Sequence, residues 1–317
     1  MKSGDDKYNF LGRLRIADTL VSIAWSNGAD NTIMLYYKSY LYSSATYKPL
    51  NQFVLQDKTA HVFVVQCALS GNFVVGVITD KTVYTTLVSQ SLRVLRKSEE
   101  ALNENFSKFD KLESFLDKND VLYLALGKNL KKKKQQLRLV RYAINTNLLT
   151  INAVGRMKFI TNDFKITATD DGDKIALAGT MPQMGLDDTG VGKMVIGLYC
   201  LEFNPQLKMI SNKNVLLVEE GLTNFKKLLG EPKSELSLFD SYLTPIGNFR
   251  VNDIKYCSEG NLVAVFQDMP STSEYYFGNV AIIDFYANNE ESVLSIPSIS
   301  KLPSQTSWNN DTLKIDY

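Results

Sequence analysis

Apolar and polar positions along this 317-residue chain repeat one order five times. Each repeat reads as an apolar strand, a tight polar turn, a second apolar strand, a loop, and two further strands of which the last is polar. The turns recur about every 50 residues, apart from a longer fourth step, and such a period indicates a stack of supersecondary units. The five turns centre on Ala17–Thr19, Ser70–Asn72, Lys118–Asp120, Asp171–Asp173 and Glu259–Asn261.

The second strand is the most apolar segment of each repeat, as in Phe73–Ile78, Val121–Leu126 and Leu262–Gln267. A continuous apolar run predicts a strand that is buried on both faces. The fourth strand is the most polar, as an edge strand must be to avoid pairing with other sheets. Two-residue turns of Gly, Asn and Asp between the first two strands are typical of hairpins. We therefore expect five antiparallel sheets of four strands each.

With these repeats the chain resembles a β-propeller over nearly its whole length. The Trp-Asp dipeptide of WD40 repeats, the paired glycines of kelch and the Ser-x-Asp-x-Gly box of sialidase-type blades are absent, so the blades look most like divergent TolB-like or YVTN-like ones. The resemblance implies an all-β fold, with five visible four-stranded blades in one domain over 1–317. Leu313–Tyr317 would supply a closing strand or begin a sixth blade. A pair of β-sandwich domains is the alternative, and the even length of the units argues against it.

The longer fourth step contains a segment with helical periodicity, 219–247. Leu222, Phe225 and Leu228 share one helical face, and Gly230 would end the helix. We predict a short helical insertion between blades four and five that packs over the blade tops. A helix that docks on a partner is the alternative.

Charge and cysteine content narrow the class of protein. The 35 basic and 34 acidic residues leave a net charge of +1, so the chain has no general attraction for nucleic acid or anionic membranes. Cys67, Cys200 and Cys257 lack metal-ligand spacing and are expected to be buried in a reducing compartment. Residues 1–7 lack the apolar core of a signal peptide. We expect a soluble cytoplasmic protein, with an exported protein that has lost its signal peptide as the alternative.

Motifs that would carry catalysis or hold a cofactor fail on inspection. His61 is the single histidine, which excludes multi-histidine metal sites and most catalytic triads, and we expect it to cap a blade loop. Gly185–Lys193 departs from the spacing of a phosphate loop. Thr169–Asp173 lacks the alternating oxygen ligands of a calcium loop. We therefore predict no catalytic residue, no metal and no cofactor.

The sharpest charge cluster is formed by Lys128 and Lys131–Lys134, in the loop expected over Gly127–Gln135. Such a run is typical of an exposed hairpin tip that keeps a sheet edge soluble. An anion-binding patch for nucleic acid or phospholipid is the alternative. The run contains no aromatic residue, which disfavours stacking with single-stranded nucleic acid.

Long insertions fall in the loops between second and third strands and in the links between blades. Because strands alternate in direction, these segments emerge together on one face of a propeller, and loops on a rigid scaffold commonly bind partners. The insertions are Gly127–Gln135, Thr180–Lys193, Glu219–Gly247 and Asp268–Gly278. The residues predicted to contact a partner are Met181, Met184, Tyr275, Tyr276, Phe277, Lys131, Lys132, Lys133 and Lys134.

These observations favour a non-enzymatic propeller scaffold that binds a protein or a ligand on its long-loop face. A protein partner is the first expectation, a small ligand the second, and nucleic acid is disfavoured. The alternative is a hydrolase or lyase that acts on a sugar-like substrate in the central channel, which would need paired carboxylates. Three or more carboxylates at the channel mouth would favour that alternative.

Overall fold

Every regular element in the described part of the chain is a β-strand. The computed structural model describes residues 8–16, 19–39, 46–106, 108–130, 134–157, 163–182, 195–216, 249–257, 260–268, 280–285 and 293–296. The strands form five antiparallel sheets of four, and each sheet follows chain order. The predicted all-β class is confirmed.

The five sheets are blades 1 to 5. Blade 1 comprises β1 (Asn9–Ile16), β2 (Thr19–Asn27), β3 (Thr32–Ser39) and β4 (Lys48–Val54). Blade 2 comprises β5 (Thr59–Gln66), β6 (Phe73–Thr79), β7 (Thr82–Val88) and β8 (Val94–Ala101). Blade 3 comprises β9 (Lys111–Leu116), β10 (Val121–Leu130), β11 (Lys134–Ala143) and β12 (Leu148–Met157). Blade 4 comprises β13 (Phe164–Ala168), β14 (Ile175–Pro182), β15 (Val195–Phe203) and β16 (Met209–Leu216). Blade 5 comprises β17 (Phe249–Tyr256), β18 (Leu262–Asp268), β19 (Val280–Asp284) and β20 (Val293–Ile296).

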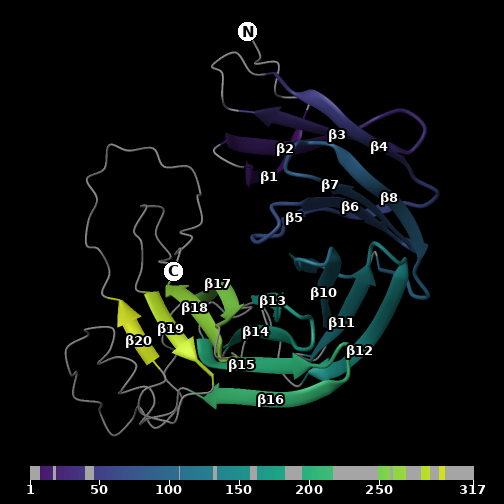
Figure 1. Cartoon of the computed structure of the whole chain (residues 1–317). Helices are drawn as coiled ribbons and strands as arrows, with labels where there is room; N and C mark the ends of the chain where they lie inside the picture. Colours follow the sequence, from purple (N-terminus) through teal and green to yellow (C-terminus); the bar gives the residue numbers. More distant parts are fainter. Residues whose placement is uncertain are drawn as a thin grey trace, which may run out of the picture.

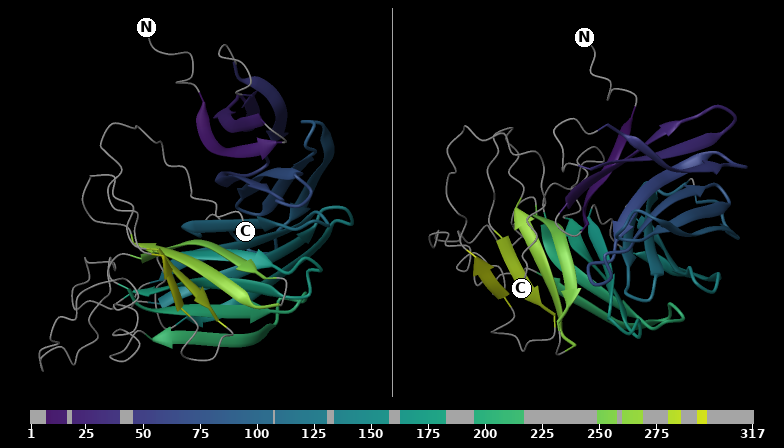
Figure 2. Two further views of the ribbon diagram at one scale, coloured as in Figure 1. Left: turned by 60° about the vertical axis from the view of Figure 1, so that its left-hand side comes forward. Right: turned by 45° about the horizontal axis from the view of Figure 1, so that its top comes forward.

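The first strands of neighbouring blades contact one another in chain order, from β1 to β5, β9, β13 and β17. Figure 1 shows the sheets following one another along an arc, with β1, β5, β13 and β17 toward the middle and β4, β8, β12 and β16 on the outside. The views in Figure 2 show the same succession, from the purple first blade to the yellow-green fifth. Four-stranded antiparallel blades placed radially in this way are the architecture of a β-propeller.

An apolar core lies between each pair of consecutive blades. All seven residues of β6 are buried, and they alternate between two cores. Phe73, Val75 and Val77 belong to the core shared with blade 1, whereas Val74 and Ile78 belong to the core shared with blade 3. The predicted burial of the second strand on both faces is confirmed, since a strand with a blade on each side needs apolar residues at every position.

Gly76 interrupts the apolar run of β6 for a steric reason. A Cβ atom at this position would lie 2.3 Å from Cζ of Phe63, far inside van der Waals contact. The ring of Phe63, which comes from the first strand of the same blade, therefore lies directly against the glycine backbone. The side chain missing at Gly76 is replaced by an aromatic ring from the neighbouring strand.

The turn between β1 and β2 has the predicted two residues, since Ile16 pairs with Thr19, whereas the corresponding turns of blades 2 to 5 are longer. In blade 2 the N–H of Cys67 donates to the carbonyl of Asn72 at 2.8 Å, which encloses residues 68–71 rather than two residues. Gly71, Gly172 and Gly260 close their turns with φ of 69°, 74° and 82°. This left-handed conformation favours glycine. The turn composition was therefore recognised correctly, but the extra residues of a bulged turn were not.

Two predicted loops are shorter than expected because their strands continue further. Leu130 pairs with Lys134, so β10 and β11 occupy much of the predicted loop Gly127–Gln135. Lys128 pairs with Gln136 inside the sheet and is half-buried, so its placement at an exposed hairpin tip was wrong. Similarly, β14 extends to Pro182, so Met181 lies in a strand rather than in the insertion over Thr180–Lys193. Backbone pairing tolerates charged or polar side chains, which can leave the sheet toward solvent.

Several other expectations meet the structure only in part. Cys67 and Cys200 are buried as predicted, but Cys257 is exposed, because it lies directly before the blade 5 turn. The helical insertion over 219–247 and the closing segment Leu313–Tyr317 lie outside the described residues, and the single domain over 1–317 stays a prediction. No helix in the described part of the chain has the length and apolar character needed to span a membrane.

Candidate functional site

Contacts between the ends of the first strands define two faces of the propeller. Nε2 of His61, at the start of β5, lies 2.9 Å from the carbonyl of Phe109, just before β9. At the opposite end, Nε2 of Gln66 donates to the carbonyl of Arg15 at 2.7 Å, which joins the ends of β5 and β1. The first strands therefore start on a common side. We name the side where they start the loop face and the opposite side the turn face. His61 caps a blade link, as its position in the sequence predicted.

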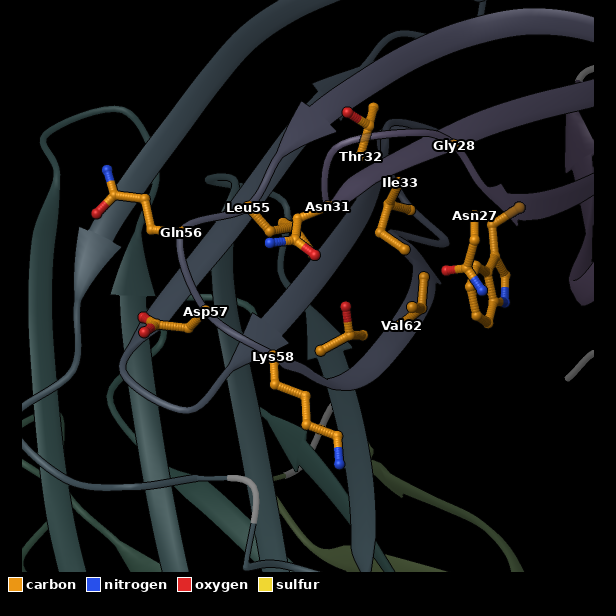
Figure 3. Close-up of a pocket in the computed structure, with 12 residues that line it drawn as sticks. Asn27, Gly28, Asn31, Thr32, Ile33, Leu55, Gln56, Asp57, Lys58 and Val62 are labelled. Atoms are coloured by element: carbon orange, nitrogen blue, oxygen red, sulfur yellow. The ribbon is translucent and has the colours of Figure 1, made fainter.

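A pocket of about 630 Å³ lies between blades 1 and 2 on the loop face. Its walls come from the end of β2, the β2–β3 turn, the link from β4 to β5 and the start of β5 (Figure 3). We name it the blade 1–2 pocket. In Figure 3, Asn27 lies on the right and Asp57 on the left, with Ile33, Asn31 and Val62 between them.

The strand pattern of blade 1 places an indole and an amide at the pocket. Ile23, Trp25 and Asn27 alternate along β2 and therefore share one face of the sheet. Ile23 is fully buried in the core shared with blade 2, Trp25 is half-buried against that core, and Asn27 is exposed. Ile33, which pairs with Asn27 on β3, is buried beside it. This face of β2 therefore contributes to the core at Ile23 and to the pocket at Trp25 and Asn27.

Backbone hydrogen bonds hold the opposite wall in place. The N–H of Leu55 donates to the carbonyl of Asn31 at 3.0 Å, which ties the link to the β2–β3 turn. Asn31 itself has a left-handed φ of 54°, a conformation that asparagine tolerates better than most residues. The N–H of Gln56 donates to the hydroxyl of Tyr84 at 3.3 Å. Burial raises the pKa of Tyr84, so this hydroxyl is neutral under ordinary conditions. The pocket is therefore preformed on both sides.

Polar side chains around the pocket are available to a ligand. Within the described residues, the side chains of Asn27, Asn31, Asp57 and Lys58 form no hydrogen bond or ion pair. Asp57 and Lys58 carry opposite charges on adjacent residues, so they leave the pocket without net charge. The site combines an aromatic surface with unpaired donors and acceptors, which is the usual make-up of a small-molecule site.

The loop-face end of the junction between blades 3 and 4 is closed by four charged side chains, which we name the inner-strand charge cluster: Lys111, Glu113, Asp163 and Lys165. Nζ of Lys111 lies 2.8 Å from Oδ1 of Asp163, and Nζ of Lys165 lies 3.0 Å from Oε2 of Glu113. Asp163 also accepts a hydrogen bond from the N–H of Val251 in blade 5. The cluster therefore joins three blades, and its carboxylates are engaged with donors of the protein.

A buried carboxyl marks the turn-face end of the same junction. Asp117 is 3% exposed and accepts hydrogen bonds from the N–H groups of Asn119 and Val121, at 2.8 and 2.9 Å, and from the hydroxyl of Tyr123 at 3.2 Å. Burial raises the pKa of Asp117, and it raises that of Tyr123 too. The arrangement organises a turn, as aspartate at the start of a turn commonly does.

The described residues offer little else for catalysis or metal binding. Among them, no group of three or more His, Cys, Asp or Glu side chains could hold a metal ion. Burial raises the pKa of the Cys200 thiol to about 12, so this cysteine is no nucleophile. The described loop face therefore carries the inner-strand charge cluster and, at the blade 1–2 pocket, neutral polar groups, an indole and the charges of Asp57 and Lys58.

Of the predicted partner residues, Met181 and Lys134 lie in the described part of the chain. Met181 pairs with Gly197 in β14, and Lys134 starts β11. Met184, Tyr275–Phe277 and Lys131–Lys133 lie outside the described residues, so their role in partner binding stays a prediction. The blade 1–2 pocket was missed because its turn, Gly28–Asn31, is short and Trp25 has the pattern of a core residue. The available signal was the change from apolar to polar residues at the end of β2.

No protein-family model matches the chain. No curated protein matches it by sequence. Among solved structures, an α-L-arabinofuranosidase from Clostridium thermocellum is 10% identical, over 94% of this chain and 96% of its own, with a TM-score of 0.38. The WD40 domain of SCAP from fission yeast is 10% identical, over 91% and 64%, with a TM-score of 0.38. The Dos1 propeller is 9% identical, over 92% and 60%, with a TM-score of 0.37.

The chain is a β-propeller on the evidence of its own five sheets and of the contacts between their first strands.

Proposed function

We propose that this chain is a non-enzymatic propeller scaffold that binds a protein partner or a ligand on its loop face. One observation carries the proposal: the blade 1–2 pocket. It presents the half-buried Trp25 together with side chains of Asn27, Asn31, Asp57 and Lys58 that form no bond within the described residues. Unpaired polar groups beside an aromatic surface, on a preformed wall, are suited to binding.

The alternative, a hydrolase or lyase in the central channel, has weaker support. Such chemistry needs one carboxyl that donates a proton and a second carboxylate that faces the substrate. Glu113 and Asp163, at the start of the inner strands, are instead bonded to Lys165, Lys111 and a backbone N–H. These bonds join blades, and a substrate would have to displace them.

A pair of matched variants tests the proposal. The pocket variant carries Asn27→Ala and Lys58→Ala, both at exposed positions of the loop face. The control carries Leu69→Ala, at a side chain that is 66% exposed in the blade 2 turn on the opposite face. Proteins and small molecules that co-purify with each variant and with the native sequence would be quantified by mass spectrometry.

We expect a partner that co-purifies with the native chain and with Leu69→Ala to be depleted from the pocket variant. Because both sets of changes are at the surface, both variants should fold, which circular dichroism would verify. A partner that is lost from Leu69→Ala but retained by the pocket variant would place the binding surface on the turn face. That result would overturn the proposal.

A further inference from the structure

We propose that the blade 1–2 pocket takes a neutral oligosaccharide, either free or carried on a glycoprotein. This inference rests on the proposed function, since it names the ligand class of the same pocket. The charge of the pocket, its hydrogen-bonding groups, its apolar surface and its extent all suit such a ligand.

The charge of the pocket disfavours ionic ligands. Asp57 and Lys58 are the charged residues among the described lining residues, and their charges cancel. A phosphate or polyanion would meet one exposed ammonium group next to a carboxylate. Known sites for such ligands use several cations or convergent backbone N–H groups. A neutral ligand is free of this repulsion.

The hydrogen-bonding groups of the pocket match hydroxyls. Each of the Asn27 and Asn31 amides offers two N–H donors and one carbonyl acceptor, and Thr32 and Thr59 add hydroxyls that donate and accept. A sugar hydroxyl also donates and accepts, so it can pair with an amide in either sense. An apolar ligand would leave these groups unpaired, which costs binding free energy.

The apolar surface of the pocket matches the face of a sugar ring. Trp25 is half-buried against the core, with Ile33, Leu55 and Val62 also in the lining. A pyranose ring presents C–H groups on one face and hydroxyls around its edge. The C–H face can pack on an indole while the edge reaches the amides, so both kinds of surface are satisfied together.

The extent of the pocket favours a chain of sugars over a single one. Its volume of about 630 Å³ lies within the range of small-molecule sites, about 300–1,000 Å³. The labelled side chains in Figure 3 are spread widely, from Asn27 on one side to Gln56 and Asp57 on the other, rather than gathered round one point. A peptide is the competing elongated ligand, and it would commonly add to a free strand edge. Of the wall strands, β2 and β3 are each paired on both sides already, whereas β5 pairs with β6 alone, so a peptide could add only along β5.

The indole provides the experiment. The chain has two tryptophans, Trp25 and Trp308, so Trp308→Phe leaves Trp25 as the sole indole. The full chain with this change would be titrated with cellotetraose, xylotetraose, mannotetraose and maltotetraose while the fluorescence of Trp25 is recorded. We expect a saturable change with at least one of them. In the same background, Asn27→Ala should weaken the affinity about tenfold, and Leu69→Ala should leave it unchanged.

Two further arms separate the sources and the competitor. Ribonuclease B would be tested before and after removal of its N-linked glycan; a response that depends on the glycan assigns a glycoprotein as the source, and a response to tetrasaccharides alone assigns free oligosaccharide. A proline-rich peptide tests the competing class. A response to the peptide alone overturns the carbohydrate assignment and leaves the pocket as a binding site.

The remaining outcomes separate this inference from the proposed function. If the fluorescence of Trp25 changes with none of the tetrasaccharides and not with the glycoprotein, the carbohydrate assignment is overturned. If Asn27→Ala with Lys58→Ala nevertheless depletes a cellular partner, the proposed function stands without it. Sugar binding that calorimetry detects but that Asn27→Ala does not weaken places the sugar elsewhere and also overturns this inference.

Discussion

The junction between blades 1 and 2 and the junction between blades 3 and 4 are built alike in their interiors and differently at the loop face. Each buries an apolar core supplied by alternate residues of the second strands. At the loop face, the junction of blades 3 and 4 is closed by Lys111 with Asp163 and by Lys165 with Glu113. The junction of blades 1 and 2 opens there into a pocket.

The difference shows which part of the repeat is under structural constraint. A core residue must fill its place in every blade, because a cavity costs stability wherever it lies. The rim of a junction can be left open, because polar groups in contact with solvent carry little penalty, or closed by charged side chains that then depend on their partners. Variation at the rim is therefore where a binding site can arise without loss of the fold.

The largest effect is expected in the shared interiors, where the two junctions should behave alike. Phe73 in the first core and Phe164 in the third are both fully buried. Phe73→Ala and Phe164→Ala should each lower the free energy of unfolding by about 3–5 kcal/mol. Urea denaturation measures both. A cost below about 1 kcal/mol at one of them, against the usual range for buried aromatics, would show that its junction is loosely packed and that the two interiors differ.

The next largest effect on the free energy of unfolding is expected at the closed loop-face end of the junction between blades 3 and 4. Asp163, whose side chain is 16% exposed, bonds to Lys111 and to the N–H of Val251. Asp163→Ala leaves these donors without that acceptor and should cost about 1–3 kcal/mol. Asp163→Asn, which keeps one acceptor oxygen, should recover part of the loss. Equal stability of the Ala variant and the native chain in urea would mean that the cluster does not hold the blades together.

A pH effect is expected at the turn-face end of the closed junction. Because burial raises the pKa of Asp117, the folded chain binds this proton more readily than the unfolded chain does. The native chain should therefore lose stability as the pH rises from the usual aspartate value, 3.8, through the higher folded pKa. Asp117→Asn, which cannot titrate, should remove this slope from urea titrations at several pH values. An unchanged slope would assign it to other carboxyls.

The smallest effect is expected at the open rim. Asn27→Ala combined with Asp57→Ala should change the free energy of unfolding by no more than about 0.5 kcal/mol, as surface substitutions usually do. The same double variant should lose the ligand response of Trp25. A stability loss as large as that of Asp163→Ala would make these side chains structural, and the contrast between the two rims would disappear.

The sequence predicted the repeating part of the fold well. Burial of Phe73–Ile78 on both faces follows from its apolar run, and the turns at Gly71 and Gly260 follow from their composition. The length of the turns in blades 2 to 5 was missed, because a residue with positive φ adds to a hairpin without changing the kinds of residue present. Lys128 was placed in a loop because charge suggests exposure, whereas backbone pairing carries β10 beyond it.

The candidate site could not be predicted in the same way. Its walls come from two blades, and their approach depends on how Asn31 and Leu55 bond across the turn and the link. In the sequence, Trp25 has the pattern of a core residue. Its position at a pocket becomes visible only in the fold, where polar residues of the β4–β5 link lie near it. Long loops indicated which face binds a partner. The pocket is lined by the short turn Gly28–Asn31, so loop length could not indicate it.

The shared cores have a consequence for how the chain folds. No described blade has an interior of its own, since β6 supplies Phe73 to the core with blade 1 and Val74 to the core with blade 3. Units of this kind gain stability only from their nearest neighbours. The first productive event is then the meeting of two consecutive blades, which closes a chain segment of about 50 residues at modest entropic cost. Any junction can act as the nucleus, and each finished blade offers an apolar surface on which the next one in the chain assembles.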